Sequence, residues 1–365
     1  MNRRQFLLGS TQLAFASWAL SGCQKLGSST WLVSAVKDND GKFAVVAIDH
    51  AGKLINKIAL PERGHDLLAL PRKPGHAIVF SRRPDRFAIE VNFAEGKVVD
   101  SFTSQNDSHF YGHGVLSSDG NFLFTSENLY EAKQGVLVVR NTDNYAVEAR
   151  FNSHGIGPHQ LKLMPDNKTL VIANGGILTH PDFPRLKLNL DSMQSNLAYI
   201  NSQNGELLNL VEPLNKHQSL RHLDVSLKGD VIVGAQYQGK NNQVQPLVFL
   251  HRQGNQMLTE FEATQEQWRD MQQYTASILV AGKQAYVTCP RGDNLYFMDI
   301  EAHKILNSQK ISDCAGIAKS SLGITVSNGF GQITSIKGQV NNPQVNNHQF
   351  KGLHFDNHMI TIDSA

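Results

Sequence analysis

A histidine recurs at the same place in four successive stretches of the chain, and this repeat limits the possible folds more than any other feature. The stretches are RGHDLLAL around His65, YGHGVLSS around His113, GPHQLKLM around His159 and LRHLDVSL around His222. Each stretch opens a short apolar strand, which a turn with Gly, Asp or Asn connects to a more β-branched strand. The first three histidines are 48 and 46 residues apart, and the fourth follows after 63. Such a period with about four short strands is typical of β-propeller blades.

The strand pattern predicts an all-β, seven-bladed β-propeller of the WD/YVTN-like kind that fills residues 31–365 as a single domain. The segment Trp31–Leu60 contains only three strands, and the C-terminal stretch KGLHFDNHMITI supplies the missing one. This pairing closes the ring and leaves no exposed sheet edge. Because the pattern near Gly338–His348 is weak, six or eight blades remain alternatives. Complete units of four strands are expected to begin at His65, His113, His159, His222, Ala276 and Cys314.

The first 30 residues have the features of an export signal. Arg3 and Arg4 precede Phe6 and Leu7, which resembles the twin-arginine consensus, and an apolar stretch follows. The sequence LSGC then matches a lipobox, so we expect residues 1–22 to be a signal peptide, Cys23 to be lipidated and residues 23–30 to be a tether. The expected location is the periplasm, with Gln24 favouring the outer membrane.

Two other interpretations of this segment stay open. One is a secretory signal with a chance cysteine, and the other is a short membrane anchor. The apolar stretch is shorter than the roughly 20 residues that a membrane span needs.

The charge balance argues against a nucleic-acid partner. Arg3 and Arg4 are the only charged residues among the first 22, so the remaining chain carries 32 basic and 32 acidic side chains. Nucleic-acid binding needs a basic surface, which this balance does not supply.

Propeller geometry predicts that the repeated histidines meet at one mouth of the central channel. In each blade the start of the innermost strand and the loop after the second strand lie on the same face of the ring. We therefore expect a ring of His65, His113, His159 and His222. The loops would add the candidate ligand-binding residues Arg82, Glu127, Asn174, Arg291 and Asn328.

Neutral imidazoles that converge from several blades form a suitable site for iron, copper or zinc. The alternative is structural, because in WD-repeat propellers a Gly-His pair holds each blade together by hydrogen bonds. Gly64-His65 and Gly112-His113 fit that alternative, whereas Pro158-His159 and Arg221-His222 do not.

The last blade has Cys314 at the expected ring position, and Cys289 ends the second strand of the preceding blade. Both cysteines should lie on the same face in neighbouring blades. Three interpretations are open: a disulfide, which an oxidising compartment favours, two free buried thiols, or Cys314 as a soft metal ligand beside the imidazoles.

A long interruption, Gly175–Met193, separates the second and third strands of the fourth unit. It contains His180, Asp182 and Arg185 among apolar residues. Loops of this length in a compact domain are usually functional or disordered. We expect an ordered flap over the channel mouth, and a solvated loop is the alternative.

The chain resembles a bacterial family of exported propeller proteins without an assigned activity. The resemblance is strongest in GIGPHQLKLMPDNKTLVIANGGILTHPDFPRLKLNLDSMQSNL, and YGHG and RHLDVS also belong to it. Members are often encoded beside imelysin-type periplasmic iron-uptake lipoproteins and a di-haem-like oxidoreductase. The resemblance implies the fold, an envelope location and an association with iron acquisition, with those two proteins as partners. The matching residues are His113, His159, Asn174, His180, Pro181, Asp182, Arg185, Asn189, Asp191, Arg221 and His222.

Three functions are compatible with these features. The first is a non-enzymatic periplasmic protein that binds a metal or an anionic metal chelate at the channel mouth, with Arg82, Arg185 and Arg291 pairing with chelator carboxylates. The second is a scaffold that docks iron-uptake partners. The third is a lactonase-like or quinoprotein-like enzyme, which as a hydrolase would need a metal or base near Glu127 and a histidine as proton shuttle. We favour the first, and the propeller fold does not decide among them.

Overall fold

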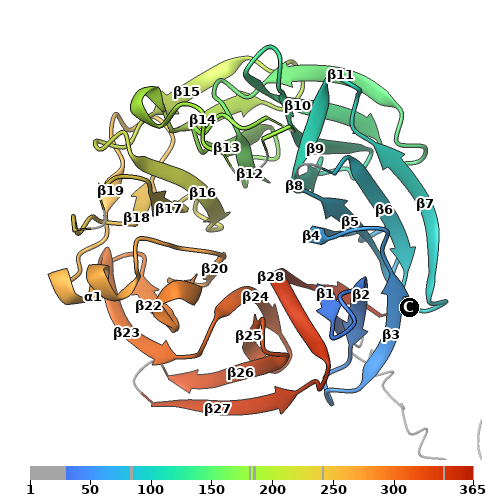
Figure 1. The fold of residues 1–365 in the computed structure, drawn as a ribbon. Helices are drawn as coiled ribbons and strands as arrows, with labels where there is room; N and C mark the ends of the chain where they lie inside the picture. The colour runs from blue at the N-terminus through green and yellow to red at the C-terminus, as the bar shows by residue number, and fades with distance from the viewer. Residues whose placement is uncertain are drawn as a thin grey trace, which may run out of the picture.

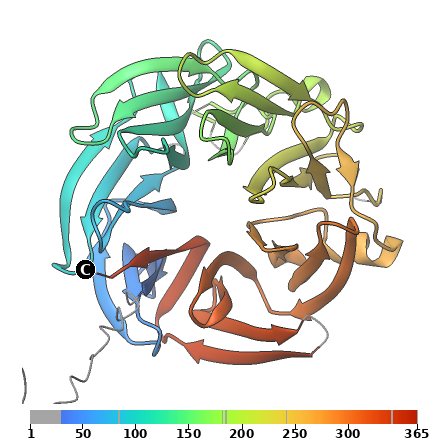
Figure 2. The ribbon, with the colours of Figure 1, turned by 180° about the vertical axis from the view of Figure 1, so that it is seen from behind.

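Seven four-stranded antiparallel sheets surround a central axis, so the chain forms a seven-bladed β-propeller (Figure 1). Figure 2 shows the same ring from behind. The computed structural model describes residues 30–82, 85–180, 182–183, 186–240, 242–339 and 342–364. The predicted class and the count of seven blades are confirmed. No helix in these ranges is long and apolar enough to cross a membrane.

The strands of each blade follow one another from the axis to the rim. Blade 1 contains β28 (Leu353–Asp363), β1 (Thr30–Asp38), β2 (Phe43–Ile48) and β3 (Leu54–Ala59). Blade 2 contains β4 (Gly64–Ala69), β5 (His76–Ser81), β6 (Phe87–Asn92) and β7 (Lys97–Thr103). Blade 3 contains β8 (Ser108–Leu116), β9 (Phe122–Leu129), β10 (Gln134–Asn141) and β11 (Val147–Asn152). Blade 4 contains β12 (Pro158–Leu163), β13 (Thr169–Asn174), β14 (Asn196–Asn201) and β15 (Leu207–Val211). Blade 5 contains β16 (Gln218–Val225), β17 (Val231–Tyr237), β18 (Val248–His251) and β19 (Thr259–Glu260). Blade 6 contains β20 (Ile278–Ala281), β21 (Gln284–Cys289), β22 (Asn294–Asp299) and β23 (Lys304–Lys310). Blade 7 contains β24 (Cys314–Ser320), β25 (Gly323–Asn328), β26 (Gln332–Gln339) and β27 (Asn342–Gln349).

The ring closes as predicted, because the last strand, β28, is the innermost strand of blade 1. It pairs antiparallel with β1 along its whole length, from Thr30 opposite Asp363 to Asp38 opposite Leu353. The first and last described strands therefore belong to one sheet, and blade 1 has four strands like the other blades.

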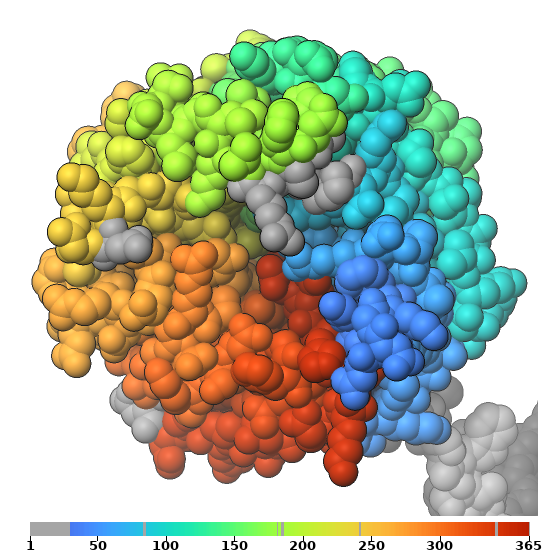
Figure 3. Space-filling view, in the orientation of Figure 1, coloured from blue at the N-terminus to red at the C-terminus, as the bar shows by residue number. Residues whose placement is uncertain are grey.

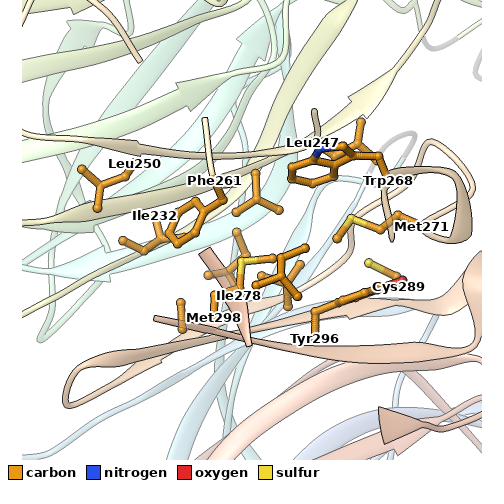
Figure 4. Packing of buried hydrophobic residues seen from close by; sticks show 14 of the residues in the cluster. Ile232, Leu247, Leu250, Phe261, Trp268, Met271, Ile278, Cys289, Tyr296 and Met298 are labelled. Atoms are coloured by element: carbon orange, nitrogen blue, oxygen red, sulfur yellow. The ribbon is translucent and has the colours of Figure 1, made fainter. Parts of the chain in front are cut away.

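The core consists of apolar layers between neighbouring blades. The layer between blades 5 and 6 includes Phe261, Trp268 and Met298 (Figure 4). Trp268 reaches it from the short helix α1 (Gln265–Asp270), whose Thr264 and Gln267 form a capping box. Strands such as β13 are buried along their whole length, which explains their continuous apolar sequence.

The innermost strands are irregular at the level of the repeated histidines. In blade 4, Pro158 pairs with Asn174 and Gln160 with Ala173, so His159 has no partner across the strand pair. The register also shifts around His65, His113, His222 and His358. A β-bulge redirects a side chain, and here the bulges lie where the histidines approach the axis.

The long interruption of blade 4 lies between β13 and β14, as predicted, and its described part is ordered. The Asn189 side chain accepts a hydrogen bond from the Leu178 amide at 2.7 Å and donates one to the Gly176 carbonyl at 2.8 Å. A 3-10 turn, η1 (Leu190–Ser192), follows. The space-filling view shows this segment in lime green on the near face of the ring, over blade 4 (Figure 3).

Candidate metal centre

Five histidines from five consecutive blades meet at the axis. They are His358 on β28, His65 on β4, His113 on β8, His159 on β12 and His222 on β16. All five are at most 5% exposed. The structure therefore brings together the four histidines of the sequence repeat and adds a fifth. Two positions differ from the expected pattern, because β8 and β16 begin several residues before His113 and His222 instead of at them.

The imidazole rings lie close enough together for several of them to contact one bound metal ion. His159 and His222 have ring centroids 4.5 Å apart, and the His65 and His358 centroids are separated by 4.6 Å. In the group His65, His113, His222 and His358, one ring nitrogen from each residue lies within 4.8 Å of the other three. Four nitrogens arranged tetrahedrally around one zinc ion lie about 3.4 Å from one another, so the farthest pair has to approach by up to about 1.4 Å when an ion binds.

Hydrogen bonds from outside the cluster fix the tautomers of two of these rings. His113 donates from Nδ1 to the Asp66 carboxylate at 2.7 Å. The Ser277 hydroxyl donates to the Asn357 carbonyl at 2.9 Å, so its oxygen accepts the Nδ1 proton of His358 at 3.3 Å. Both rings are therefore left with a lone pair on Nε2. Metal-bound histidines are commonly held by such a carboxylate or hydroxyl partner.

Six imidazole nitrogens of the cluster have no hydrogen-bond partner within the described part of the chain: both nitrogens of His65, Nε2 of His113 and of His358, and Nδ1 of His159 and of His222. His159 and His222 share a hydrogen bond between their Nε2 atoms, 3.1 Å apart. Buried polar atoms without partners are costly and need an explanation. A cation among these rings would accept several of the lone pairs.

Burial keeps four of the imidazoles neutral, those of His65, His159, His222 and His358. It lowers the pKa values of His65, His159 and His222 well below the usual value, and nearby cationic groups such as Arg82 lower them further. The pKa of His358 falls to about 3, mainly through burial. Metal ions bind the neutral form of imidazole. These four rings are therefore ready to bind a metal at neutral pH without first losing protons.

Asp66 supplies negative charge beside the cluster. Burial alone would raise its pKa, but the nearby His113 and His358 and the hydrogen bond from His113 lower it to about 2. The Asp66 carboxylate is therefore ionised at neutral pH. This charge favours a cation among the rings.

His358 was not predicted from the sequence, although a signal for it was present. The stretch KGLHFDNHMITI completes the first blade, and its strand lies innermost. An innermost strand has a ring position like the others. The sequence contains two histidines there, His354 and His358, and the bulge that selects His358 cannot be seen in the sequence pattern.

The structure does not place Cys314 in the ring. Cys314 pairs with Asn328 and Gly316 with Ser327, so the bulge position of blade 7 belongs to Ala315. The Cys314 thiol instead donates to the Asn294 carbonyl.

Cys289 and Cys314 are both free and buried, so the disulfide interpretation does not match the structure. Cys289 belongs to the apolar layer between blades 5 and 6, whereas Cys314 belongs to a layer formed by blades 6 and 7. The two thiols thus pack in different layers.

Three of the other candidate residues hold the fold together. Glu127 is fully buried and pairs with Arg140 at 2.8 Å. Asn174 donates to the Ser153 carbonyl, and Asn328 donates to the Ser312 carbonyl. Each asparagine thereby ties the end of a second strand to the loop that enters the innermost strand of its own blade.

The remaining candidates have different surroundings. Arg82 is half-buried and close enough to lower the pKa values of four cluster histidines. Arg291 stacks on Tyr274 at 4.3 Å. His180 is near the carboxylates of Glu131 and Asp182, 3.7 and 3.6 Å away, and it is not part of the five-histidine cluster. Arg185 and Cys23 lie outside the described residues.

Comparison with known proteins gives a family and a fold. The family described as "Protein of unknown function (DUF1513)" matches residues 58–362. No curated protein matches the chain. Among solved structures, hydrazine synthase from Kuenenia stuttgartiensis is similar, with a TM-score of 0.60 and 13% sequence identity over 87% of this chain and 95% of that chain. At this identity the likeness concerns the fold alone. Since the family match covers most of the sequence, the chain belongs to the DUF1513 family.

Proposed function

We propose that this propeller binds one transition-metal ion on its axis, with His65, His113, His222 and His358 as ligands. The observation that supports this most strongly is the convergence of four buried imidazole nitrogens within 4.8 Å of one another. His159 contacts His222 and either orients it or replaces it as a ligand. The proposal moves the site from a wide channel mouth to a compact centre inside the ring.

The donor set favours copper, zinc or iron. It consists of nitrogen ligands alone, whereas calcium and magnesium prefer oxygen ligands. Copper(II) forms the most stable complexes with such ligands among the divalent ions of this row. What the protein holds in the cell also depends on which metal is available.

Metal analysis combined with mutation tests this function. We expect one equivalent of metal in protein purified from its own cell envelope, and one equivalent of zinc or copper bound by the apo protein. The double variant His113→Ala, His358→Leu should lose this metal. His50→Ala is the matched control, since His50 is exposed and lies outside the cluster.

The same variants separate a metal centre from a purely structural cluster. Zinc at 100 times its Kd should stabilise the native chain by about 2.7 kcal/mol. If zinc raises the melting temperature of His50→Ala but not of the double variant, the histidines are ligands. A stable double variant and a native protein that zinc does not stabilise would contradict the proposal and favour a scaffold, in which the cluster serves packing alone.

We also propose that the chain is exported by the twin-arginine route and lipid-anchored at Cys23. The support is the Arg3-Arg4 pair and the LSGC sequence. Cys23→Ala should move the mature protein from the membrane fraction to the soluble periplasm. Processing before residue 23 can be checked by mass spectrometry of the purified protein.

A role in iron acquisition, together with an imelysin-like lipoprotein and a di-haem oxidoreductase, is a finer proposal that rests on the family resemblance. It predicts that iron predominates in protein isolated from iron-replete cells. It also predicts that an imelysin-like partner co-purifies. If copper or zinc fills the centre under those conditions, the metal-binding function stands and the iron role does not.

A further inference from the structure

A cavity of about 390 Å³ lies on the axis directly beside the histidine cluster. Asp66, Ser277 and His358 belong to both, because they line the cavity and also form or contact the cluster. All seven innermost strands, with Ser277 just before β20, contribute to its wall. The cavity is therefore the part of the central channel that adjoins the proposed metal.

The lining residues show on which side of the cluster the cavity lies. In every blade that carries a cluster histidine, the lining residues begin at that histidine or after it. Examples are Asp66 after His65, Gly114 after His113 and Gln160 after His159. The described residues between β13 and β14 follow a second strand and lie at the opposite end of the channel. The cavity thus opens on the face away from this segment, which differs from the mouth that the sequence predicted as the binding side.

The charges around the cavity favour an anion once a metal is bound. A divalent ion among neutral imidazoles adds two positive charges, and Asp66 offsets one of them. Lys162 and Asp224 form an ion pair at 3.3 Å, which leaves the local balance unchanged. Lys319 also lines the cavity and adds positive charge. The net charge beside a bound divalent metal is therefore positive.

Lys162 can contact a molecule in this cavity. Its side chain is 40% exposed while that of Asp224 is 17% exposed. The second carboxylate oxygen of Asp224 accepts the Val280 amide at 2.8 Å, so Asp224 is fixed. The Lys162 ammonium has three donors, and a ligand can accept from it while the pair with Asp224 persists.

We propose that this cavity binds a small carboxylate-bearing anion, which coordinates the axial metal through one oxygen and accepts a hydrogen bond from Lys162. This inference rests on the proposed metal centre and adds the class of its ligand and the face from which it enters. Binding is a ligand addition in which a carboxylate lone pair is donated to the metal, with no change of oxidation state.

The test uses the full-length chain loaded with one equivalent of copper(II). Azide, as a small anionic probe, and malonate, as a dicarboxylate, are titrated separately while the copper absorption and EPR spectra are recorded. We expect both to change the spectra and to saturate. Lys162→Met should weaken malonate binding by about 5- to 10-fold, because one charge-assisted hydrogen bond is lost at a partly solvated site.

A second variant tests the direction of access. Thr361 lines the cavity and is half-exposed; Thr361→Trp should obstruct malonate more than the smaller azide. Thr259→Trp, on the exposed outermost strand β19, is the matched control.

The outcomes separate the two proposals. If copper does not bind, the metal centre itself fails. If copper binds but neither anion alters its spectra, or if Thr361→Trp and Lys162→Met both behave like the control, the anion site is wrong while the metal centre stands.

Discussion

Asp66 is the residue that most clearly links the cluster to its surroundings. It is buried, ionised and bonded to Nδ1 of His113, so it fixes the tautomer that leaves Nε2 available. In Asp66→Asn the side-chain oxygen can still accept this hydrogen bond, but the negative charge is lost. We expect metal affinity to fall by about 10- to 100-fold, as for other partners of metal-bound histidines. Competition with a chromophoric chelator measures the change, and Asp182→Asn on the exposed segment is the control.

Gly112 allows His65 and His113 to approach each other. It has a φ of +97°, and a Cβ atom at this position would lie 2.5 Å from the His65 ring. Gly112→Ala should therefore strain the backbone and displace the imidazole. We expect a loss of about 1–3 kcal/mol in the free energy of unfolding and a weaker metal site.

Denaturant unfolding of the apo form and a zinc titration test the Gly112 prediction together. Gly282→Ala is the control. Gly282 also has a positive φ, but a Cβ atom added there would meet no other atom within 4 Å. An equal loss of zinc affinity in both variants would show that the close contact with His65 is not the cause.

The residues of the cluster could be predicted from the sequence only where they occupy the same position in each of the repeated stretches. Four of the five cluster histidines follow from the spacing of similar stretches, and they meet because the blades are related by rotation. Glu127, Asn174 and Asn328 are polar residues at the expected ends of second strands, yet each of them forms hydrogen bonds within the fold, Asn174 through its Nδ2 atom. Which polar side chain is free and which is satisfied depends on partners from distant segments, and the linear pattern does not contain that information.

At the scale of elements, the segment between β13 and β14 is anchored by hydrogen bonds at its base. Asn189→Ala removes both bonds of its side chain, to Leu178 and to Gly176. We expect the segment to loosen locally by about 1–3 kcal/mol, and we expect metal affinity to stay the same because the cavity opens on the other face.

Hydrogen exchange at the amides of Leu178 and Leu188 reports this loosening. The Leu178 amide donates to Asn189, and the Leu188 amide donates to the Leu178 carbonyl. The Val171 amide in the buried strand β13 should exchange as slowly as in the native chain. A parallel fall in zinc affinity would contradict the view that the segment is separate from the metal centre.

Strand order and closure were predictable because apolar runs and turn residues alternate with a regular period. The bulges were not, since a bulge is a property of two paired strands. One shift of register moves a side chain from the sheet to the axis. This explains why Cys314 was predicted in the ring, while the structure places Ala315 there.

At the scale of the whole molecule, the buried histidines make stability depend on pH. In the unfolded chain each titrates near about 6.5, whereas the pKa values of His65, His159 and His222 are well below this in the native state. The unfolded state therefore binds more protons below pH 6.5, and the free energy of unfolding falls on acidification. Each histidine contributes about 1.4 kcal/mol per pH unit in this range. The depressed pKa of Asp66 acts in the same direction, between about pH 4 and its native value of about 2.

Urea unfolding of the apo protein between pH 8 and 5 measures this dependence. We expect nearly constant stability above pH 7 and a steep decline below 6.5. Replacing His65 and His222 by leucine removes two of the groups and should flatten the decline by about 3 kcal/mol per pH unit. His50→Ala should leave the slope as it is, because His50 is exposed. If the leucine variant and the native chain show the same slope of unfolding free energy against pH, His65 and His222 are not held neutral in the native state. The electrostatic argument for a site of neutral imidazoles that is ready to bind a metal would then be wrong.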